Sequence, residues 1–532
     1  MRYHIGFAIV AALAASTGGL AQAPSGARTT AVLSDLHMGI GRDGSGAWHP
    51  YEDFRWAAEF VAFLEAENRS GNAAVDLVLN GDTIDFLQAA EPDCSVGPDV
   101  GCSDAELVSR LERVLSAHKV EFDALRTFVQ SGSNRVTFVP GDADAALLLP
   151  TVKSRLLRAF GARADRVAVA SDGYWISSDG RIHAEHGHQL AWFGDGLPQW
   201  PSPVRREGGR DRLTRSLGER LTGDLYRTLE RKYPLVDNVA IRGAGLKRAL
   251  SAEGATSGAA VTPELVKYLL LSTISWQQFR MELDDGDVEP PTWIVADVRA
   301  QGGSFLLSSL ADDDPIRALA LDRLKGPDID QVARAMSPLS DEEIVMLCDY
   351  RAAVRRARRR FEPAVSQFAP RGPAVAECPR TPDTRGGLFD YFWRARDHAY
   401  AGYIEAAQRR LPGGAIPTVF VLGHTHLPDR AQEGANAISG GLLTIAMEGF
   451  SPRRGAVTPV VINDGAWQRT VTPVQLERRL TDRPFSSLVP EDLAPCYSFV
   501  EISPYTDAPS PHIRFWRQDR SGAWGKAGNC NE

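Results

Sequence analysis

Five short apolar segments of this chain each end in polar residues rich in aspartate and histidine. Short apolar runs bounded by turn residues are typical of buried strands. Helical patterns at residues 54–67 and 106–130 lie between the early runs, and this alternation predicts a layered α/β core. Ligands in such cores collect at strand ends. The apolar runs are residues 30–33, 75–79, 136–139, 182–185 and 418–422, and the polar groups that follow are 34–37, 80–82, 140–144, 186–188 and 423–426.

The character of the chain changes between Trp192 and Pro417. Residues 203–216 are charged and rich in turn residues, and the sequence from there to about residue 411 has mainly helical patterns. We therefore expect a helical insertion or cap at 201–411 that divides the core into a first part, 29–200, and a second part, 412–532. Further strands are expected in the second part, at 442–447, 460–462, 498–502 and 512–516.

The first 23 residues have the pattern of a cleaved secretory signal. Arg2 precedes an apolar run at 5–15, and small residues at 21–23 form a cleavage site. We expect a mature chain that begins near Pro24 and is exported, to the periplasm or the medium. No later run reaches the roughly 18 apolar residues of a membrane span, so none is expected in the mature protein.

Cysteine content and charge add two expectations. Six cysteines in an exported protein favour disulfides, with buried free thiols as the alternative. The formal net charge of −8 argues against general nucleic-acid binding. Nearest-neighbour pairing would join Cys94 to Cys102, Cys348 to Cys378 and Cys496 to Cys530.

The order of the polar motifs carries more information than any one of them. Asp35-Leu36-His37 and Gly81-Asp82 are common sequences by chance, whereas Gly423-His424-Thr425-His426 after an apolar strand is more specific. Together, in this order, they resemble the calcineurin-like metallophosphoesterases, whose pattern is Asp-x-His, Gly-Asp, Gly-Asn-His-Asp/Glu, a later His, and Gly-His-x-His. The resemblance covers residues 29–190 and 417–465 and implies a β-sandwich core flanked by helices.

The resemblance also implies a pair of metal ions and a reaction. Mixed carboxylate and imidazole ligands suit Mn, Fe or Zn, as divalent or mixed-valence ions, better than Ca. The implied reaction is hydrolysis of a phosphate mono- or diester by a metal-bridging hydroxide. The implied ligands of the first ion are Asp35, His37, Asp82 and His426; those of the second are Asp82, Asp142, His186 and His424.

Three histidines at 183, 186 and 188 compete for one ligand position. We favour His186, because related enzymes often carry His-Gly there and Gly187 follows it. In an extended chain His188 shares a side with His186, whereas His183 faces the opposite side. His188 is therefore a candidate catalytic or substrate-facing residue, and His183 is expected to be structural.

The sequence departs from the family pattern at Gly141-Asp142-Ala143-Asp144, where the family has Gly-Asn-His-Asp. Asp142 can replace the asparagine oxygen as a ligand. Ala143 cannot replace the histidine, which in the family stabilises the transition state or protonates the leaving group, a role generally contributing on the order of 10² to 10⁴-fold. Asp144, which in the family orients that histidine, is the second candidate catalytic residue, and we expect it to cap the helix that follows.

The additional carboxylate at 142 brings the formal charge of the predicted site close to zero, so other cations would have to attract a phosphate ester. Arg42, Arg430 and Arg453 follow the motifs and are candidates for substrate binding. Two functions remain: an exported metal-dependent phosphoesterase, or a metal-binding pseudoenzyme whose helical insertion binds a partner. The complete set of ligand positions favours the enzyme.

Overall fold

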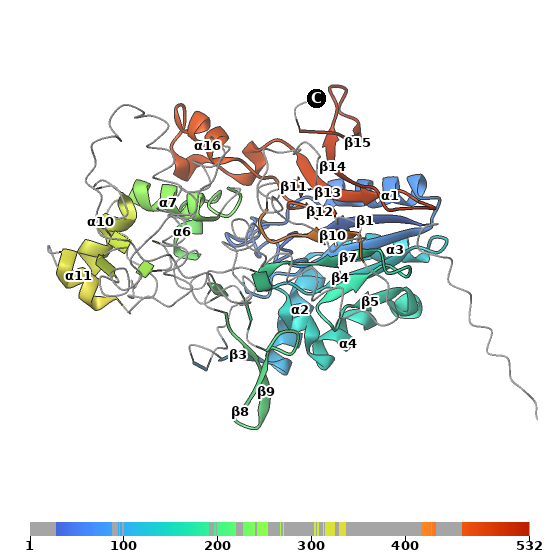
Figure 1. The fold of residues 1–532 in the computed structure, drawn as a ribbon, viewed down its shortest axis with the longest axis horizontal. Coiled ribbons are helices and arrows are strands. Elements are labelled where there is room, and N and C mark those ends of the chain that lie inside the picture. The colour runs from blue at the N-terminus through green and yellow to red at the C-terminus, as the bar shows by residue number, and fades with distance from the viewer. Residues whose placement is uncertain are drawn as a thin grey trace, which may run out of the picture.

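The protein is a mixed α/β structure built on two principal sheets (Figure 1). The computed structural model describes residues 28–87, 100–190, 199–216, 227–239, 242–253, 314–324, 329–336, 417–426, 428–431 and 460–530, with isolated residues between these ranges. Several expectations fall outside the described residues: the signal segment, the strand at 442–447, the Cys348–Cys378 pair and the role of Arg453.

The first sheet has seven strands in the order β15-β14-β13-β1-β2-β4-β5. The strands β1, β2, β4 and β5 run parallel, and β13 joins the edge of β1 antiparallel and leads to β14 and β15. Their bounds are β1 Thr29–Leu33, β2 Val75–Asn80, β4 Arg135–Val139, β5 Val167–Val169, β13 Cys496–Ile502, β14 Pro511–Gln518 and β15 Trp524–Ala527.

The second sheet has five strands in the order β11-β12-β10-β7-β6. Its centre is parallel, and its two edge strands are antiparallel. The bounds are β6 Tyr174–Ile176, β7 Ile182–Glu185, β10 Val419–Leu422, β11 Asp429–Ala431 and β12 Val460–Asn463. All five apolar runs that end in polar residues are therefore strands, as the sequence predicts.

The two sheets pack face to face. Val32 and Val78 of the first sheet share one apolar cluster with Ala184 and Val421 of the second. The neighbouring residues of β1, Ala31 and Leu33, point the other way into a larger cluster with the helices. This alternation along each strand buries both faces of the first sheet, which is typical of parallel strands covered on both sides.

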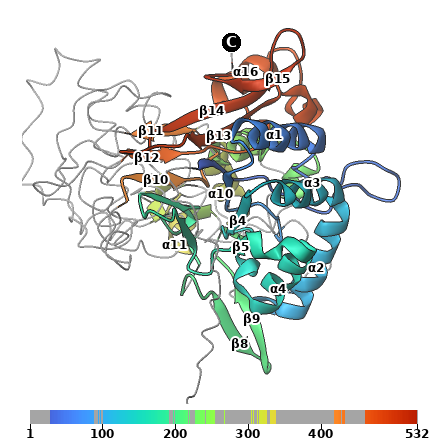
Figure 2. The same cartoon turned by 90° about the vertical axis from the view of Figure 1, so that its right-hand side faces the viewer.

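Four helices cover the outer face of the first sheet, on the side away from β10 and β12 (Figure 2). They are α1 Ala57–Ser70, α2 Asp104–Ala117, α3 Lys119–Gln130 and α4 Pro150–Arg158. The single helix expected at 106–130 is therefore two. The break falls at His118, whose buried ring lies 3.3 Å from Glu52 and 3.3 Å from Glu121.

The segment between the two parts of the core begins differently from expectation. Instead of a turn-rich region, residues 204–214 form a hairpin of β8 Val204–Glu207 and β9 Arg210–Thr214, which pairs with β3 Val100–Ser103. Gly208 and Gly209 both have positive φ (58° and 75°), as a tight two-residue hairpin turn requires. The helices described after it are α6 Arg227–Glu230, α7 Arg242–Glu253, α10 Pro315–Arg323 and α11 Ile329–Ala335.

One further α-helix, α16, and several 3-10 helices complete the described elements. They are η2 Ala145–Leu148, η3 Gly161–Arg166, η4 His188–Leu190, α16 Pro473–Leu480, η9 Phe485–Ser487 and η10 Pro490–Asp492.

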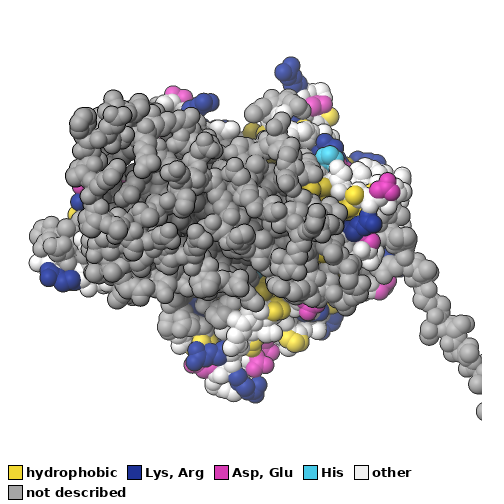
Figure 3. All heavy atoms as spheres, in the orientation of Figure 1, with side chains coloured by type: hydrophobic (Ala, Val, Ile, Leu, Met, Phe, Trp, Pro, Cys, Tyr) yellow, Lys and Arg dark blue, Asp and Glu magenta, His cyan; other side chains and the backbone are white. Residues whose placement is uncertain are grey.

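Both expected disulfides that fall within the described residues are present, Cys94–Cys102 and Cys496–Cys530. They are compatible with an oxidising compartment outside the cytosol. The helices of the described ranges are all too short or too polar to serve as a membrane span. On the described surface in Figure 3, basic and acidic side chains lie interspersed.

Candidate metal centre

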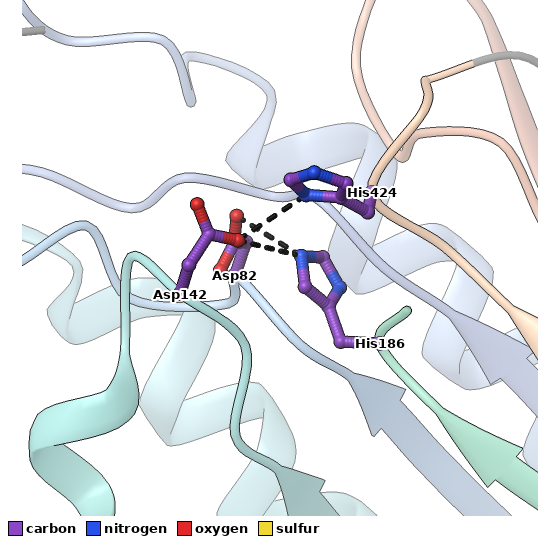
Figure 4. Close-up of side chains that lie close together, drawn as sticks. All are labelled: Asp82, Asp142, His186 and His424. Carbon is purple, nitrogen blue, oxygen red and sulfur yellow. Dashed lines mark ion pairs between the residues drawn. The ribbon is translucent and has the colours of Figure 1, made fainter. Parts of the chain in front are cut away.

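Seven buried side chains meet where strands of both sheets end. They form two groups, and within each group one potential ligand atom per residue lies within 4.8 Å of the others. The groups are Asp82, Asp142, His186 and His424 (Figure 4), and Asp35, His37 and His426. These are the seven residues that the sequence predicts as ligands. The division is the predicted one except that Asp82, predicted in both groups, belongs only to the first of these two. Their role as ligands remains a prediction.

Short distances join the members of each group. His186 Nε2 lies 3.2 Å from Asp82 Oδ2 and 3.2 Å from Asp142 Oδ1 (Figure 4). His424 Nδ1 lies 3.2 Å from the same oxygen of Asp142. In the other group, His426 Nε2 lies 3.1 Å from Asp35 Oδ1.

Asp82 lies between the two groups. Its Oδ2 atom is 3.7 Å from His37 Nε2 in one group and 3.2 Å from His186 Nε2 in the other. One carboxylate oxygen thus faces nitrogens on both sides, which is the geometry of a bridging ligand.

Several of the converging atoms lack the hydrogen bonds that buried polar atoms normally make. Within the described part of the chain, no hydrogen bond reaches Asp35 Oδ1, His37 Nε2, Asp82 Oδ2, Asp142 Oδ1 or His186 Nε2. Leaving such an atom unsatisfied costs about 1–3 kcal/mol, and more for a charged group. Because these atoms converge and combine carboxylate with imidazole, the residues fit metal ions.

Two of the imidazoles have Nδ1 partners that favour the tautomer needed for metal binding. His186 Nδ1 donates to the carbonyl oxygen of Asn80 (3.0 Å), and His37 Nδ1 pairs with Asp85 Oδ2 (3.0 Å). With the proton on Nδ1, the lone pair of Nε2 points into the group. Carboxylates and carbonyls in this position commonly orient ligating histidines.

The carboxylates are fixed in a similar way, through the oxygen that does not face the other ligands. Asp35 Oδ2 accepts hydrogen bonds from the Ser34 hydroxyl and from the backbone N–H of His424 (3.0 Å). Asp82 Oδ1 accepts from the backbone N–H of Ala143 (2.8 Å). Asp35 and Asp82 therefore each have one positioned oxygen and one oxygen directed into their group.

The backbone at the ligand positions is unusual. Left-handed φ values occur at five of the seven residues: Asp35 (55°), His37 (52°), Asp82 (49°), His424 (70°) and His426 (57°). Such conformations cost of order 1–3 kcal/mol each for residues other than glycine, and they cluster at functional sites. The chain turns sharply at each strand end and directs these side chains inward.

Glycines permit the close approach of the strand ends. A Cβ atom at Gly81, where φ is +95°, would lie 2.2 Å from His186 Nδ1. A Cβ atom at Gly141 would lie 2.3 Å from Asp82 Oδ1. Both positions exclude any larger residue without displacement of a predicted ligand.

Asp144 does not cap the following helix, so that prediction is wrong. No side-chain cap hydrogen bond is present at the start of η2. Instead the fully buried carboxylate accepts hydrogen bonds from the backbone N–H groups of Gly141 (2.6 Å) and Thr83 (2.9 Å). It thereby connects the loops after β2 and β4. Burial, followed by repulsion from Asp82, raises the pKa of Asp144 to about 7. Asp144 is thus placed to position Asp82.

His188 lies beside the group that contains His186. Its ring centroid is 5.5 Å from that of His186 and 6.4 Å from that of His424, as expected for a residue on the same side of the chain. Its ring also packs edge-on against Trp200 at 4.4 Å. Burial holds the pKa of His188 well below its usual range, so the imidazole is neutral. His183, in contrast, stacks on Tyr174 within the sheet, in agreement with a structural role.

The candidate arginines are not brought into the groups by any described contact. Arg42 is exposed, stacks on the Trp48 ring at 3.7 Å and donates to the carbonyl oxygen of Gly46 (2.7 Å). Arg430 lies in β11, and its side chain is outside the described residues. Their roles in substrate binding stay predictions.

In the metal-free protein the acids and histidines of the site pair electrostatically. Burial alone would raise the pKa values of Asp35 and Asp142, but nearby histidines, above all His426 and His424, hold both well below their usual range. Burial would likewise lower the pKa of His186, but Asp82 and Asp35 raise it well above its usual value. Metal binding would therefore release protons.

Sequence reasoning missed several supporting residues. Besides Asp85, the most informative is Asp464, which accepts the hydroxyl of Ser34 (2.7 Å) and lies at the end of β12. A signal for it existed, because Asn463-Asp464-Gly465 follows an apolar run in the same way as the ligand motifs do.

No protein-family model, curated protein or solved structure matches this chain. Its fold and site therefore define only a mixed α/β protein with buried Asp/His groups that could hold metal ions.

Proposed function

We propose that this protein is a metal-dependent phosphoesterase of the calcineurin-like type, which hydrolyses a phosphate mono- or diester. The observation that carries the proposal is the position of Asp82. Its buried Oδ2 atom makes no hydrogen bond with described residues and lies within 3.7 Å of histidine nitrogens from both groups. A shared carboxylate between two Asp/His groups is the arrangement expected for a dinuclear centre.

The surrounding architecture supports the same assignment. Two sheets packed face to face, with helices outside the first, match the β-sandwich that the motif resemblance implies. The ligand-bearing loops follow β1, β2, β4, β7 and β10 in the order of the family motifs. We infer that the segment from 201 to 411 is an insertion in this core and determines substrate selectivity.

Two Mn, Fe or Zn ions held by the seven predicted ligands would lower the pKa of a bound water and polarise the phosphoryl oxygens of the substrate. The residues of this chain position those ions. Asp85 and the Asn80 carbonyl orient His37 and His186, while the Ala143 N–H and Asp144 hold the Asp82 loop. His188, neutral and beside the second group, is the described residue best placed to contact the substrate or transfer a proton.

A second candidate function is a metal-binding protein without catalysis. Ala143 favours it, because the buried methyl group stands where the family has its acid. The backbone of Ala143 still holds Asp82, so the metal groups do not depend on the missing side chain.

Metal analysis combined with hydrolysis of p-nitrophenyl phosphate and its bis ester tests the proposal. We expect the purified full chain to contain two transition-metal ions and to hydrolyse at least one ester, and Asp82→Asn to lose both properties. Asp76→Asn, a buried aspartate at the other end of β2 that pairs with Arg28 (3.0 Å), is the matched control. Two bound ions without hydrolysis of any phosphoester would establish the second candidate, and absence of bound metal would refute both.

We also infer that the protein is exported. The sequence pattern of residues 1–23 and the two disulfides support this inference. Intact-mass measurement of the exported protein, with and without reduction, should show loss of residues 1–23 and at least one disulfide. Retention of those residues with six free thiols would refute it.

A further inference from the structure

Three carboxylates from distant parts of the chain meet beside the loop that carries His37. Asp53 precedes α1, Glu230 ends α6, and Asp237 lies in the turns that follow. One oxygen of each lies within 4.8 Å of the others, and we call these three residues the carboxylate cluster. None of them is among the seven predicted ligands of the dinuclear centre.

The cluster is buried, and Glu230 is its least satisfied member. Glu230 is 2% exposed and Asp53 is 6% exposed. Glu230 Oε2 is buried and makes no hydrogen bond within the described part of the chain. A buried carboxylate without compensation costs several kcal/mol, so this group needs a counter-charge or a proton.

Among the described residues, the charges that act on Glu230 do not supply that compensation. Burial, followed by repulsion from Asp237 and Asp53, raises the pKa of Glu230 well above its usual value. Arg55 acts in the opposite direction, but its guanidinium is engaged elsewhere. It donates to the carbonyl oxygen of Glu52 (2.8 Å) and to Glu491 (3.0 Å).

We propose that the carboxylate cluster binds a calcium ion. Its donors are oxygens alone, unlike the mixed sets of the dinuclear centre, and Ca²⁺ takes oxygen ligands at about 2.3–2.6 Å. Two ligands of one calcium ion can therefore be up to about 5.2 Å apart, and the oxygens of the cluster, within 4.8 Å of one another, meet this limit. Mg²⁺, at about 2.0–2.1 Å, requires a tighter and more regular arrangement.

A calcium ion in the carboxylate cluster would join the segment 227–239 to the core. Asp53 belongs to the core, whereas Glu230 and Asp237 belong to the segment 227–239. That segment already contacts the core near residue 470: Asn238 donates to the carbonyl oxygen of Arg469 (3.1 Å), and Val239 pairs with Val471. A calcium ion would add a further attachment, next to Asp85 and His37, with which Asp53 forms another group.

Calcium titration of the full chain tests this proposal independently of the phosphoesterase assignment. The protein is treated with EGTA and exchanged into calcium-free buffer, and its transition-metal content is measured before and after. We expect isothermal titration with calcium chloride to show one site per chain and the unfolding temperature to rise with calcium. Glu230→Gln should weaken calcium binding by about tenfold or more, since one charged ligand is lost, and should leave the transition-metal content unchanged.

Two further variants keep the test decisive. Asp237→Asn, at a half-buried position, should reproduce the loss of calcium binding if Glu230→Gln does not fold. Glu67→Gln changes another buried glutamate, in α1, where Lys526 lies 2.8 Å away, and should bind calcium as the wild type does. The proposal is overturned if the wild type binds no calcium, if both cluster variants bind it equally well, or if calcium binding is lost only in Asp82→Ala.

Discussion

The two sheets contribute chemically different ligands to the candidate metal centre. All three carboxylates, Asp35, Asp82 and Asp142, follow strands of the first sheet, together with His37. The second sheet contributes imidazoles only, from the loops after β7 and β10. Each group combines both sources, so neither sheet holds a complete ligand set. The centre therefore exists only where the two sheets are packed together, and the two sides should respond differently to substitution.

The largest effect is expected from the first sheet, at Asp82. Asp82→Ala removes a carboxylate oxygen that lies within 3.7 Å of histidine nitrogens of both groups. We therefore expect affinity for both ions to fall and activity to drop by at least about 10³-fold, because metal stabilisation of the transition state is worth several kcal/mol. Metal stoichiometry and initial rates measure this, with Asp76→Ala as the control. A folded Asp82→Ala protein with unchanged stoichiometry would contradict the assignment.

A smaller effect is expected from the second sheet, at His424. His424→Ala removes one nitrogen from the group with Asp142 and His186 and leaves the other group complete. We expect loss of a single ion, seen as a halved metal content. His183→Ala removes a histidine that stacks on Tyr174 in the same sheet, and it should retain both ions. Equal metal loss in the two variants would contradict the assignment of His424 as a ligand.

Restoration of the acid at Ala143 tests catalysis rather than binding. Ala143→His should raise activity toward alkyl phosphates, whose leaving oxygen needs a proton, more than toward p-nitrophenyl phosphate. The ratio of the two rates should narrow by up to about 10²-fold, the lower end of the range for acid–base catalysis. Ala143→Asn, which cannot donate a proton in the same way, is the control, and an identical ratio in both variants would exclude the acid role.

The smallest effect is expected from the groups that orient the histidines, which differ between His37 of the first sheet and His186 of the second. His37 is held by the Asp85 side chain, whereas His186 is held by the Asn80 backbone carbonyl, which substitution does not remove. Asp85→Asn should therefore weaken the affinity for one ion by about 10–100-fold and leave the affinity for the other unchanged. Competition with a chelator, followed by metal analysis, separates the two affinities; equal weakening of both ions would contradict this reading.

The strands and the ligand positions were predictable because both depend on local sequence. An apolar run followed by glycine, aspartate or histidine identifies a buried strand and its polar end, and β1, β2, β4, β7 and β10 lie where these runs are. The packing of the sheets, with Val32 against Ala184 and Val421 in one cluster, is not a local property and had to come from the structure.

The errors have specific physical causes. The helix pattern through 106–130 has no glycine or proline at 118. The break follows from burial of His118 between Glu52, which is distant in sequence, and Glu121, which is three residues away. Asp144 was expected to cap the helix that follows it in sequence, but the tertiary fold brings the N–H groups of Gly141 and Thr83 to its carboxylate. The β8–β9 hairpin had a local signal that was not used, Gly208-Gly209 between two short runs.

Strands β7 and β10 are parallel neighbours, with Ile182 opposite Val419, although more than 200 residues of chain lie between them. The chain leaves the core after β7 and returns beside the point of departure. A parallel crossover needs only about a dozen residues, so the seven predicted ligands set no upper limit on the length of this segment. Evolution could lengthen, shorten or exchange it while the centre stayed intact. The carboxylate cluster is the exception, since Glu230 and Asp237 would be inherited or lost with the segment.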